Sequence, residues 1–272
     1  MTKKHIYIAL GAISLGLLLW YFLSLKDGLY SSELWSLISI PVITSIGISI
    51  GYIIENWETL ILSLRSHLFN RNSDVYVSLS YLFRIKIKGT NKYLLVKSNK
   101  IKNQYQPVGG VYKRFPSSDQ KWNEWNALDA MDDENNSSDL RFKVKRKTIP
   151  NIRKWFLEYK NREVDVWREF SEELIDTGIF DSSSFKHVNA EFLNRKEEHL
   201  IFRKGKDIKQ FLIYDIYTVV LNEQQEQVIQ NLFKNSVITD QYAFVNEEEL
   251  DKELFKINNE EFQMGYHARY IK

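Results

Sequence analysis

The sequence predicts an α+β domain that follows two apolar segments near the amino terminus. Three observations support this prediction. Residues 6–25 and 34–54 contain no charged residue, residues 75–97 alternate in the manner of strands, and residues 152–176 carry apolar side chains at helical spacing. A chain of 272 residues has room for one globular domain and an appendage.

The composition excludes several classes of protein. Lys and Arg number 37 against 35 Asp and Glu, so the net charge is +2 and no strong attraction to a nucleic-acid polymer is expected. The chain has no cysteine, which excludes disulfides, zinc–thiolate sites and a cysteine nucleophile. The five histidines show no metal-ligand spacing.

The two apolar segments predict a transmembrane helical hairpin over residues 1–55. A helical run of about 20 residues spans the ~30 Å hydrocarbon core of a bilayer. A cleaved signal peptide is the alternative for the first run, but a second full-length run follows it. Lys3, Lys4, Arg65 and Arg71 flank the outer ends, whereas the connecting turn has only Lys26, so both termini and the large domain are expected to be cytoplasmic.

Small residues in the second run leave two interpretations open. Gly47 and Gly51 have small-xxx-small spacing, which lets helices approach closely either within one hairpin or between copies of the chain. Residues 56–71 have apolar side chains at helical spacing and predict a juxtamembrane helical linker.

The domain at residues 72–272 is predicted to mix strands and helices. Strands are expected at residues 75–88, 93–97, 186–193, 200–203, 209–220 and 241–245, and helices at residues 152–176, 223–234 and 246–256. Asn246 is the expected N-cap of the last helix, which explains the acidic residues 247–249. Residues 116–150 are interpreted as an insertion with a mobile acidic loop and an exposed basic strand.

The helix at residues 152–176 carries the pattern with the clearest chemistry. Glu169, Glu172 and Glu173 stand at i, i+3 and i+4 with Arg168 beside them, so the three carboxylates are expected to converge on one face. Their mutual repulsion favours a hard divalent cation such as Mg²⁺, which takes oxygen ligands and often bridges to phosphates. The alternative is a solvated helix face on which these residues form salt bridges.

The order of elements resembles a Nudix domain, an α/β/α sandwich. The resemblance rests on a strand hairpin, the glycine pair Gly109–Gly110, the sequence from Arg168 to Glu173 and a late strand and helix. With two transmembrane helices in front, the chain is similar to the two-transmembrane, SMODS-associated Nudix effectors of bacterial cyclic-oligonucleotide antiphage systems (CBASS). The Nudix box pattern expects Gly, Glu and Gly at three positions that hold Lys154, Lys160 and Ile175, and the nearby Glu158 and Glu163 are out of register.

The resemblance implies a site and its ligands. Glu169, Glu172 and Glu173 could ligate Mg²⁺ or Mn²⁺ with Arg168 orienting them, and Gly109, Gly110 and Arg168 are the expected ligand-binding residues. The degenerate box implies a non-catalytic nucleotide sensor. The alternative is a membrane-anchored, Mg-dependent Nudix hydrolase of nucleoside diphosphate derivatives, in which Glu172 would be catalytic.

The resemblance also implies a cellular role. The protein would be a multi-pass protein of the bacterial inner membrane that serves in antiviral defence. Its domain would sense a cyclic oligonucleotide made by a partner nucleotidyltransferase. Activation would bring copies together as a homo-oligomer, and the helices would then disrupt the lipid bilayer.

Overall fold

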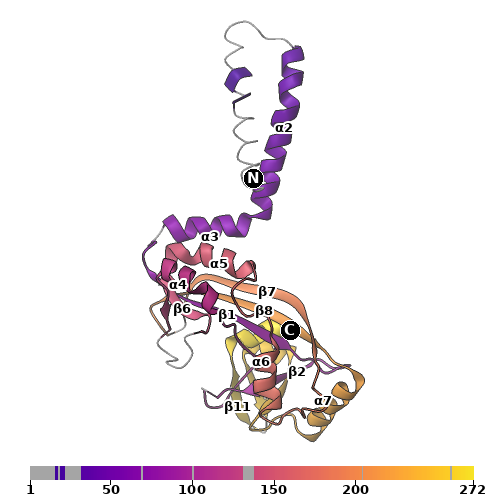
Figure 1. Cartoon of the computed structure of the whole chain (residues 1–272). Coiled ribbons are helices and arrows are strands. Elements are labelled where there is room, and N and C mark those ends of the chain that lie inside the picture. Colours follow the sequence, from indigo (N-terminus) through magenta and orange to yellow (C-terminus); the bar gives the residue numbers. More distant parts are fainter. Residues whose placement is uncertain are drawn as a thin grey trace. The chain divides into compact units, whose positions relative to one another are not determined.

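The computed structural model describes residues 16–17, 19–21, 32–68, 70–99, 101–130, 138–203, 205–257 and 259–272. The chain divides into two compact units, Met1–Phe69 and Asn70–Lys272 (Figure 1). Most of the first predicted apolar run lies outside the described residues, as does much of the predicted acidic loop, at residues 131–137.

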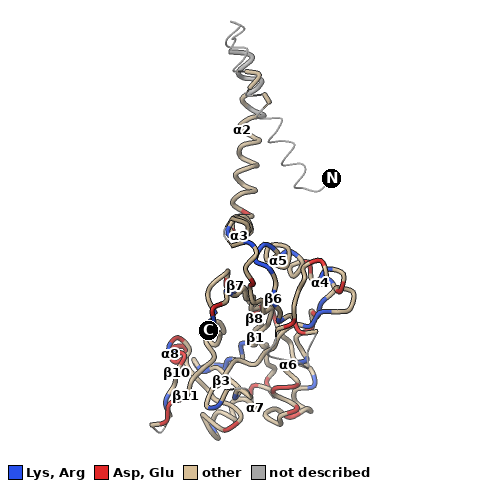
Figure 2. Tube along the Cα trace, turned by 90° about the vertical axis from the view of Figure 1, so that its left-hand side faces the viewer, with Lys and Arg blue, Asp and Glu red and all other residues tan. Residues whose placement is uncertain are grey.

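The first unit contains helices α2 (Ser32–Glu55) and α3 (Trp57–Leu68). Helix α2 covers the predicted second apolar run, and its residues 34–54 carry no charge (Figure 2). Among the described residues, no helix combines the length and the apolarity that a membrane crossing requires. Helix α3 forms over the predicted juxtamembrane segment, where the spacing of its leucines favours a helix.

Two β-sheets form the centre of the second unit. The first has the strand order β5-β6-β1-β8-β7 with β4 also paired to β1, and the second has the order β10-β11-β3-β2-β9. The strands of the first sheet are β1 (Asp74–Arg84), β4 (Gly109–Val111), β5 (Leu128–Asp129), β6 (Arg141–Lys145), β7 (Asn189–Phe202) and β8 (Lys209–Val220). Those of the second are β2 (Lys92–Lys97), β3 (Gln104–Gln106), β9 (Tyr242–Asn246), β10 (Leu254–Ile257) and β11 (Glu260–Met264).

Helices accompany both sheets, so the content is mixed α and β as the sequence predicts. They are α4 (Asp119–Trp125), α5 (Ile149–Leu157), α6 (Trp167–Phe170), α7 (Glu223–Asn235) and α8 (Glu247–Lys252), with 3-10 turns η1 (Pro116–Ser118), η2 (Arg146–Thr148) and η4 (Tyr266–Ile271). Helices α4 and α5 join β6 through an aromatic cluster in which Trp122 lies 4.3 Å from Phe142 and Trp125 lies 5.5 Å from Trp155, measured between ring centroids.

Local sequence signals predict the bounds of several elements correctly. Strand β8 has the predicted bounds, β2 and α7 deviate by one residue at one end, and β9 is shifted by one residue at both ends. Asn246 caps α8 as expected, because its side chain accepts from the Glu249 N–H at 2.9 Å and Glu249 in turn accepts from the Asn246 N–H at 2.7 Å. The first-turn acids of α8 are visible in Figure 2. The helix ends at Lys252, earlier than predicted, because Glu253 is left-handed (φ 54°) and β10 follows.

The single helix predicted at residues 152–176 is wrong. Helix α5 ends at Leu157, and a loop follows in which Tyr159 and Asn161 have positive φ angles of 55° and 61°. The buried Arg162 holds this loop, since its guanidinium donates to the Phe156 carbonyl at 3.0 and 3.1 Å. Apolar periodicity continues on both sides of the loop, which is why the pattern suggested one helix.

Two strand predictions also need correction. The segments predicted at residues 186–193 and 200–203 are one long strand, β7, because its charged centre finds partners: Arg195 pairs with the buried Asp215, and Glu197 with Arg153 at 2.7 Å. The basic strand β6 is not simply exposed, because it pairs with β1 and buries Phe142 and Val144.

Candidate functional site

The glycine pair belongs to β4, which pairs with β1, and it lies against the helix that carries the carboxylates. Gly109 pairs with Leu82, and a Cβ added at Gly109 would lie 2.2 Å from the Tyr81 carbonyl oxygen. Its φ of +150° is also one that glycine tolerates best. A Cβ at Gly110 would lie 2.1 Å from the Glu169 carboxylate. A side chain at position 109 would therefore collide with the backbone of β1. A side chain at position 110 would have to displace the Glu169 carboxylate.

The three predicted carboxylates do not all point the same way. After α6 the backbone continues as a π-helical turn (η3, Ser171–Ile175), whose wider spacing changes the face that each side chain occupies. Glu173 accepts from the Gly109 N–H at 2.9 Å, and Glu169 accepts from Arg168 at 2.5 Å with 18% of its side chain exposed. Glu172 is 52% exposed and lies 3.4 Å from Arg168.

Burial perturbs the carboxylates nearest the glycine pair. Burial raises the pKa of Glu173 to about 8. The hydrogen bond from Gly109 lowers this pKa, and repulsion from Glu169 offsets part of that lowering. Burial likewise raises the pKa of Glu169, although Arg168 opposes the shift. Two carboxylates in this state fit the chemistry of a hard cation, which would relieve their repulsion. Among the described residues, no cluster of three or more His, Asp or Glu side chains could hold a metal ion as they stand.

Arg168 is held by a residue outside the predicted site. Its Nε donates to one oxygen of Glu163 at 3.1 Å and its Nη2 to the other at 3.3 Å, and Nη2 also reaches the Val111 carbonyl at 3.1 Å. These bonds to Glu163 and Glu169 raise the pKa of Arg168 although burial opposes them. Glu163 also accepts from the Lys113 N–H at 3.0 Å. Residue spacing did not reveal this role, because Glu163 lies in the loop that interrupts the predicted helix.

A cleft opens between the two sheets beside the glycine pair. One cavity of about 360 Å³ lies over β1 and β8, and a second of about 610 Å³ extends to Glu169, Glu173 and Asp139. The two share the lining residues Gln106, Gly109, Gly110, Val111, Arg141, Tyr266 and His267. The cleft is therefore continuous, with the box carboxylates at one end.

Alternate residues of two parallel strands form the wall of the smaller cavity. Tyr76, Ser78 and Ser80 of β1 pair in register with Gln210, Leu212 and Tyr214 of β8, and all six line the cavity. A strand turns every second side chain to one face, so this wall follows from the alternation of both strands. The sequence predicts both strands, but it does not show which of their faces borders a cavity.

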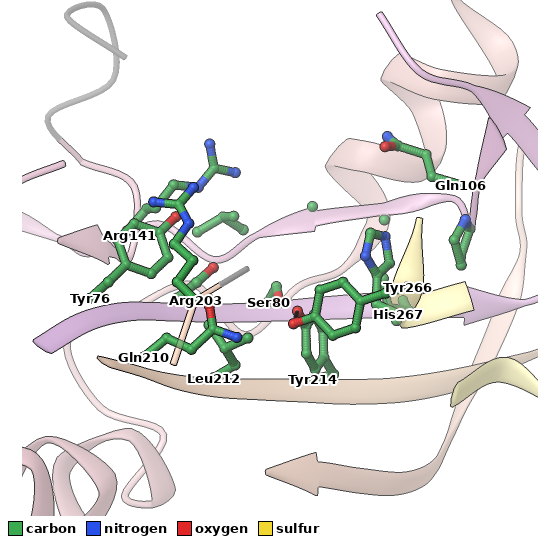
Figure 3. Close-up of a pocket in the computed structure, with 16 residues that line it drawn as sticks. Tyr76, Ser80, Gln106, Arg141, Arg203, Gln210, Leu212, Tyr214, Tyr266 and His267 are labelled. Atoms are coloured by element: carbon green, nitrogen blue, oxygen red, sulfur yellow. Dashed lines mark hydrogen bonds between the residues drawn. The ribbon is translucent and has the colours of Figure 1, made fainter. Parts of the chain in front are cut away.

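The two ends of the smaller cavity differ in chemistry (Figure 3). At one end Arg141 lies near Arg203, whose guanidinium carbon lies 4.1 Å from the Tyr76 ring centroid. At the other end the Tyr214 and Tyr266 hydroxyls are 2.9 Å apart, and the ring of His267 lies nearly parallel to that of Tyr214.

Two further residues define the electrostatics of the aromatic end. Burial lowers the pKa of His267 to about 4, so its imidazole is neutral at neutral pH. Glu198 of β7 anchors the wall, because its carboxylate accepts from Tyr266 and Gln210 at 3.3 Å each and from Tyr270.

The structure brings only part of the predicted site to the cleft. Gly109, Gly110, Glu169 and Glu173 line it, whereas Arg168 and Glu172 are absent from the lining of these two cavities. The arginines and aromatic residues of the smaller cavity were not predicted, since they come from five separate segments that only tertiary folding joins.

A two-sheet α/β domain with a glycine pair packed against an Arg-Glu-Phe-Ser-Glu-Glu helix is a Nudix-type domain. Residues 74–272 match the SMODS-associated NUDIX domain, and the chain belongs to this family. Neither a curated protein nor a solved structure gives a significant match to the chain.

Proposed function

We propose that this protein is a membrane effector of bacterial antiviral defence that senses a cyclic oligonucleotide through its SMODS-associated Nudix domain. Family membership supports the Nudix part of this proposal. The observation that carries the sensing part is the cleft, which places two arginines and a group of aromatic rings next to the box carboxylates.

The chemistry of the cleft suits a nucleotide. Aromatic faces such as those of Tyr266 and His267 can stack on a base, and a neutral imidazole can both donate and accept a hydrogen bond. The guanidinium groups of Arg141 and Arg203 suit phosphate oxygens. Volumes of about 360 and 610 Å³ lie in the range of small-molecule sites. A ligand with more than one nucleotide would occupy both cavities.

The contacts of the box favour sensing over hydrolysis. Glu169 is paired with Arg168, and Glu173 accepts a backbone hydrogen bond and has a pKa of about 8. Glu173 thus stabilises the glycine pair through Gly109, and Glu169 is occupied by Arg168. In this role the box is a rigid wall of the ligand cleft.

A hydrolase is the second candidate, and the position of Glu169 and Glu173 in the cleft favours it. These two side chains would hold Mg²⁺ or Mn²⁺, with Glu172 nearby as the candidate catalytic group. The bound metal would neutralise phosphate charge and activate water. This reading requires Glu169 to exchange its contact with Arg168 for the metal.

The membrane part of the proposal concerns the first unit. Helix α2 exposes five isoleucines, each with 44–69% of its surface accessible: Ile43, Ile46, Ile50, Ile53 and Ile54. Exposed apolar side chains in the uncharged part of a helix, here residues 34–54, suit contact with lipid. We therefore propose a location in the inner membrane with both termini in the cytoplasm. Ligand binding would favour a homo-oligomer that disrupts the bilayer, and the partner would be a nucleotidyltransferase.

Ligand binding to the full-length protein in detergent tests the proposal. Thermal unfolding would be recorded with cyclic di- and trinucleotides and with linear nucleoside diphosphate derivatives, each with and without Mg²⁺, and every mixture would be checked for products. Stabilisation by one cyclic nucleotide without turnover is expected, and Arg203→Ala should weaken it at least tenfold while Lys234→Ala on α7 should not. Turnover of a linear compound that Glu173→Gln abolishes would instead support the hydrolase.

A further inference from the structure

Strand β7 leaves one edge of the first sheet open. It stands at the end of the strand order, and no described strand pairs with its outer side. An edge strand presents unpaired N–H and C=O groups to a further strand. At 14 residues, β7 is much longer than the usual strand of about 5–6 residues, so this edge is unusually extended.

The ends of β7 expose large apolar side chains. Phe192 and Leu193 near the start are 52% and 44% accessible, and Ile201 and Phe202 at the end are 45% and 63% accessible. Each pair lies beside a register shift, between Phe192 and Asn194 or between His199 and Ile201. Such bulges often interrupt an edge. Here they flank a regular central run, residues 194–199, which pairs one to one with β8.

The charges of this central run have opposite signs in its two halves. Arg195 and Lys196 come first, and Glu197 and Glu198 follow. In an antiparallel pair of two such strands, the basic half of one lies beside the acidic half of the other, and the apolar ends meet. A parallel pair would place like charges together, which is destabilising.

We propose that the outer edge of β7 is a self-association surface that pairs antiparallel with β7 of a second copy of this chain. A twofold axis normal to the sheet and close to Glu197 would place Lys196 near Glu198 of the second copy, and Leu193 near Ile201 of the second copy. It would also bring the two Glu197 side chains together, and the ion pair that each forms with Arg153 of its own chain, at 2.7 Å, would offset their repulsion. The pairing joins the two first sheets into one continuous sheet. It does not depend on the ligand proposed above.

Lys196 is the residue through which this surface can be tested. It is exposed, whereas Arg195, Glu197 and Glu198 already have partners in their own chain. The chain has no cysteine, so Lys196→Cys introduces a single thiol. In the proposed pair, the two residues at position 196 would be diagonal neighbours about 7–8 Å apart, within reach of a short bismaleimide.

The experiment treats the full-length protein in detergent with the bismaleimide over a dilution series. Lys196→Cys is expected to give a covalent dimer whose yield exceeds that of the control Lys234→Cys at least fivefold. Lys196→Glu is expected to shift the mass measured by light scattering toward the monomer, and Lys234→Glu to leave it unchanged. Equal crosslinking in the two cysteine variants, or a mass unaffected by Lys196→Glu, would overturn the proposal.

Discussion

The raised pKa of Glu173 predicts a specific pH dependence of stability. The folded pKa is about 8, whereas the ordinary value is 4.5. Between these values the unfolded chain has lost the proton and the folded chain keeps it. The unfolding free energy must therefore fall as the pH rises through this window. The contribution of Glu173 is fully present below about pH 4.5 and is lost by about pH 8.

The size of the effect follows from the shift. Each pKa unit corresponds to about 1.4 kcal/mol, so the upper limit is about 5 kcal/mol. Since the cleft admits solvent, we expect about 2–3 kcal/mol, or roughly 5–10 °C in melting temperature for a unit of this size. Burial of the carboxyl group is the main cause, and repulsion from Glu169 adds to it.

The assay compares melting temperatures of the full-length protein between pH 5 and pH 8. Glu173→Gln keeps an acceptor for the Gly109 N–H but cannot ionise, so its curve should lie well above that of the unchanged protein at pH 8 and approach it at pH 5. The exposed Glu172→Gln is the matched control and should follow the unchanged protein. Parallel curves for Glu173→Gln and the unchanged protein would refute the reasoning. If Mg²⁺ reduces the slope only when Glu173 is present, this carboxylate is a metal ligand.

Four further substitutions test the packing of the site by thermal unfolding. Gly109→Ala should cost roughly 2–4 kcal/mol because its Cβ would overlap a β1 carbonyl, whereas Gly110→Ala meets a movable carboxylate and should cost less; equal losses would contradict this. Glu163→Gln should cost about 1–2 kcal/mol by weakening the bidentate hold on Arg168, and an unchanged melting temperature would show that this pair is dispensable. Asp215→Asn should cost about 3–5 kcal/mol because it removes the fully buried counter-ion of the partly buried Arg195, and a loss under 1 kcal/mol would show that solvent screens this pair.

Much of the fold is determined by signals that lie close together in the sequence. Strand β8 is a nearly continuous run of apolar residues, as in a strand buried on both faces, and the capping box of α8 is complete within four residues, from Asn246 to Glu249. Gly178 has a left-handed φ of 76° three residues after η3 ends at Ile175, as a glycine that follows a helix often does. The sequence likewise identified the glycine pair and the box carboxylates, because a short motif carries them.

The same local signals failed where distant contacts decide the structure. The predicted helix at residues 152–176 is broken because Arg162 finds a buried position over the ring of the distant Tyr112 as well as against Phe156, and no periodicity records that contact. The charged centre of β7 is a strand because Asp215 and Arg153 supply opposite charges across the sheet and from α5.

The site divides in the same way. The sequence by itself pointed to the box carboxylates and to the glycine pair as candidates, since each group lies within a short stretch of neighbouring residues. Only the tertiary structure decided that Glu163 holds Arg168, that Glu172 stays half exposed, and that the cleft is walled by arginines and aromatic rings. The physical reason is the distance along the chain over which each effect acts. Propensity, alternation and capping depend on a few neighbouring residues. Burial and ion pairing depend on which segments meet in space, and the wall of the cleft joins β1 to β8 from distant parts of the chain.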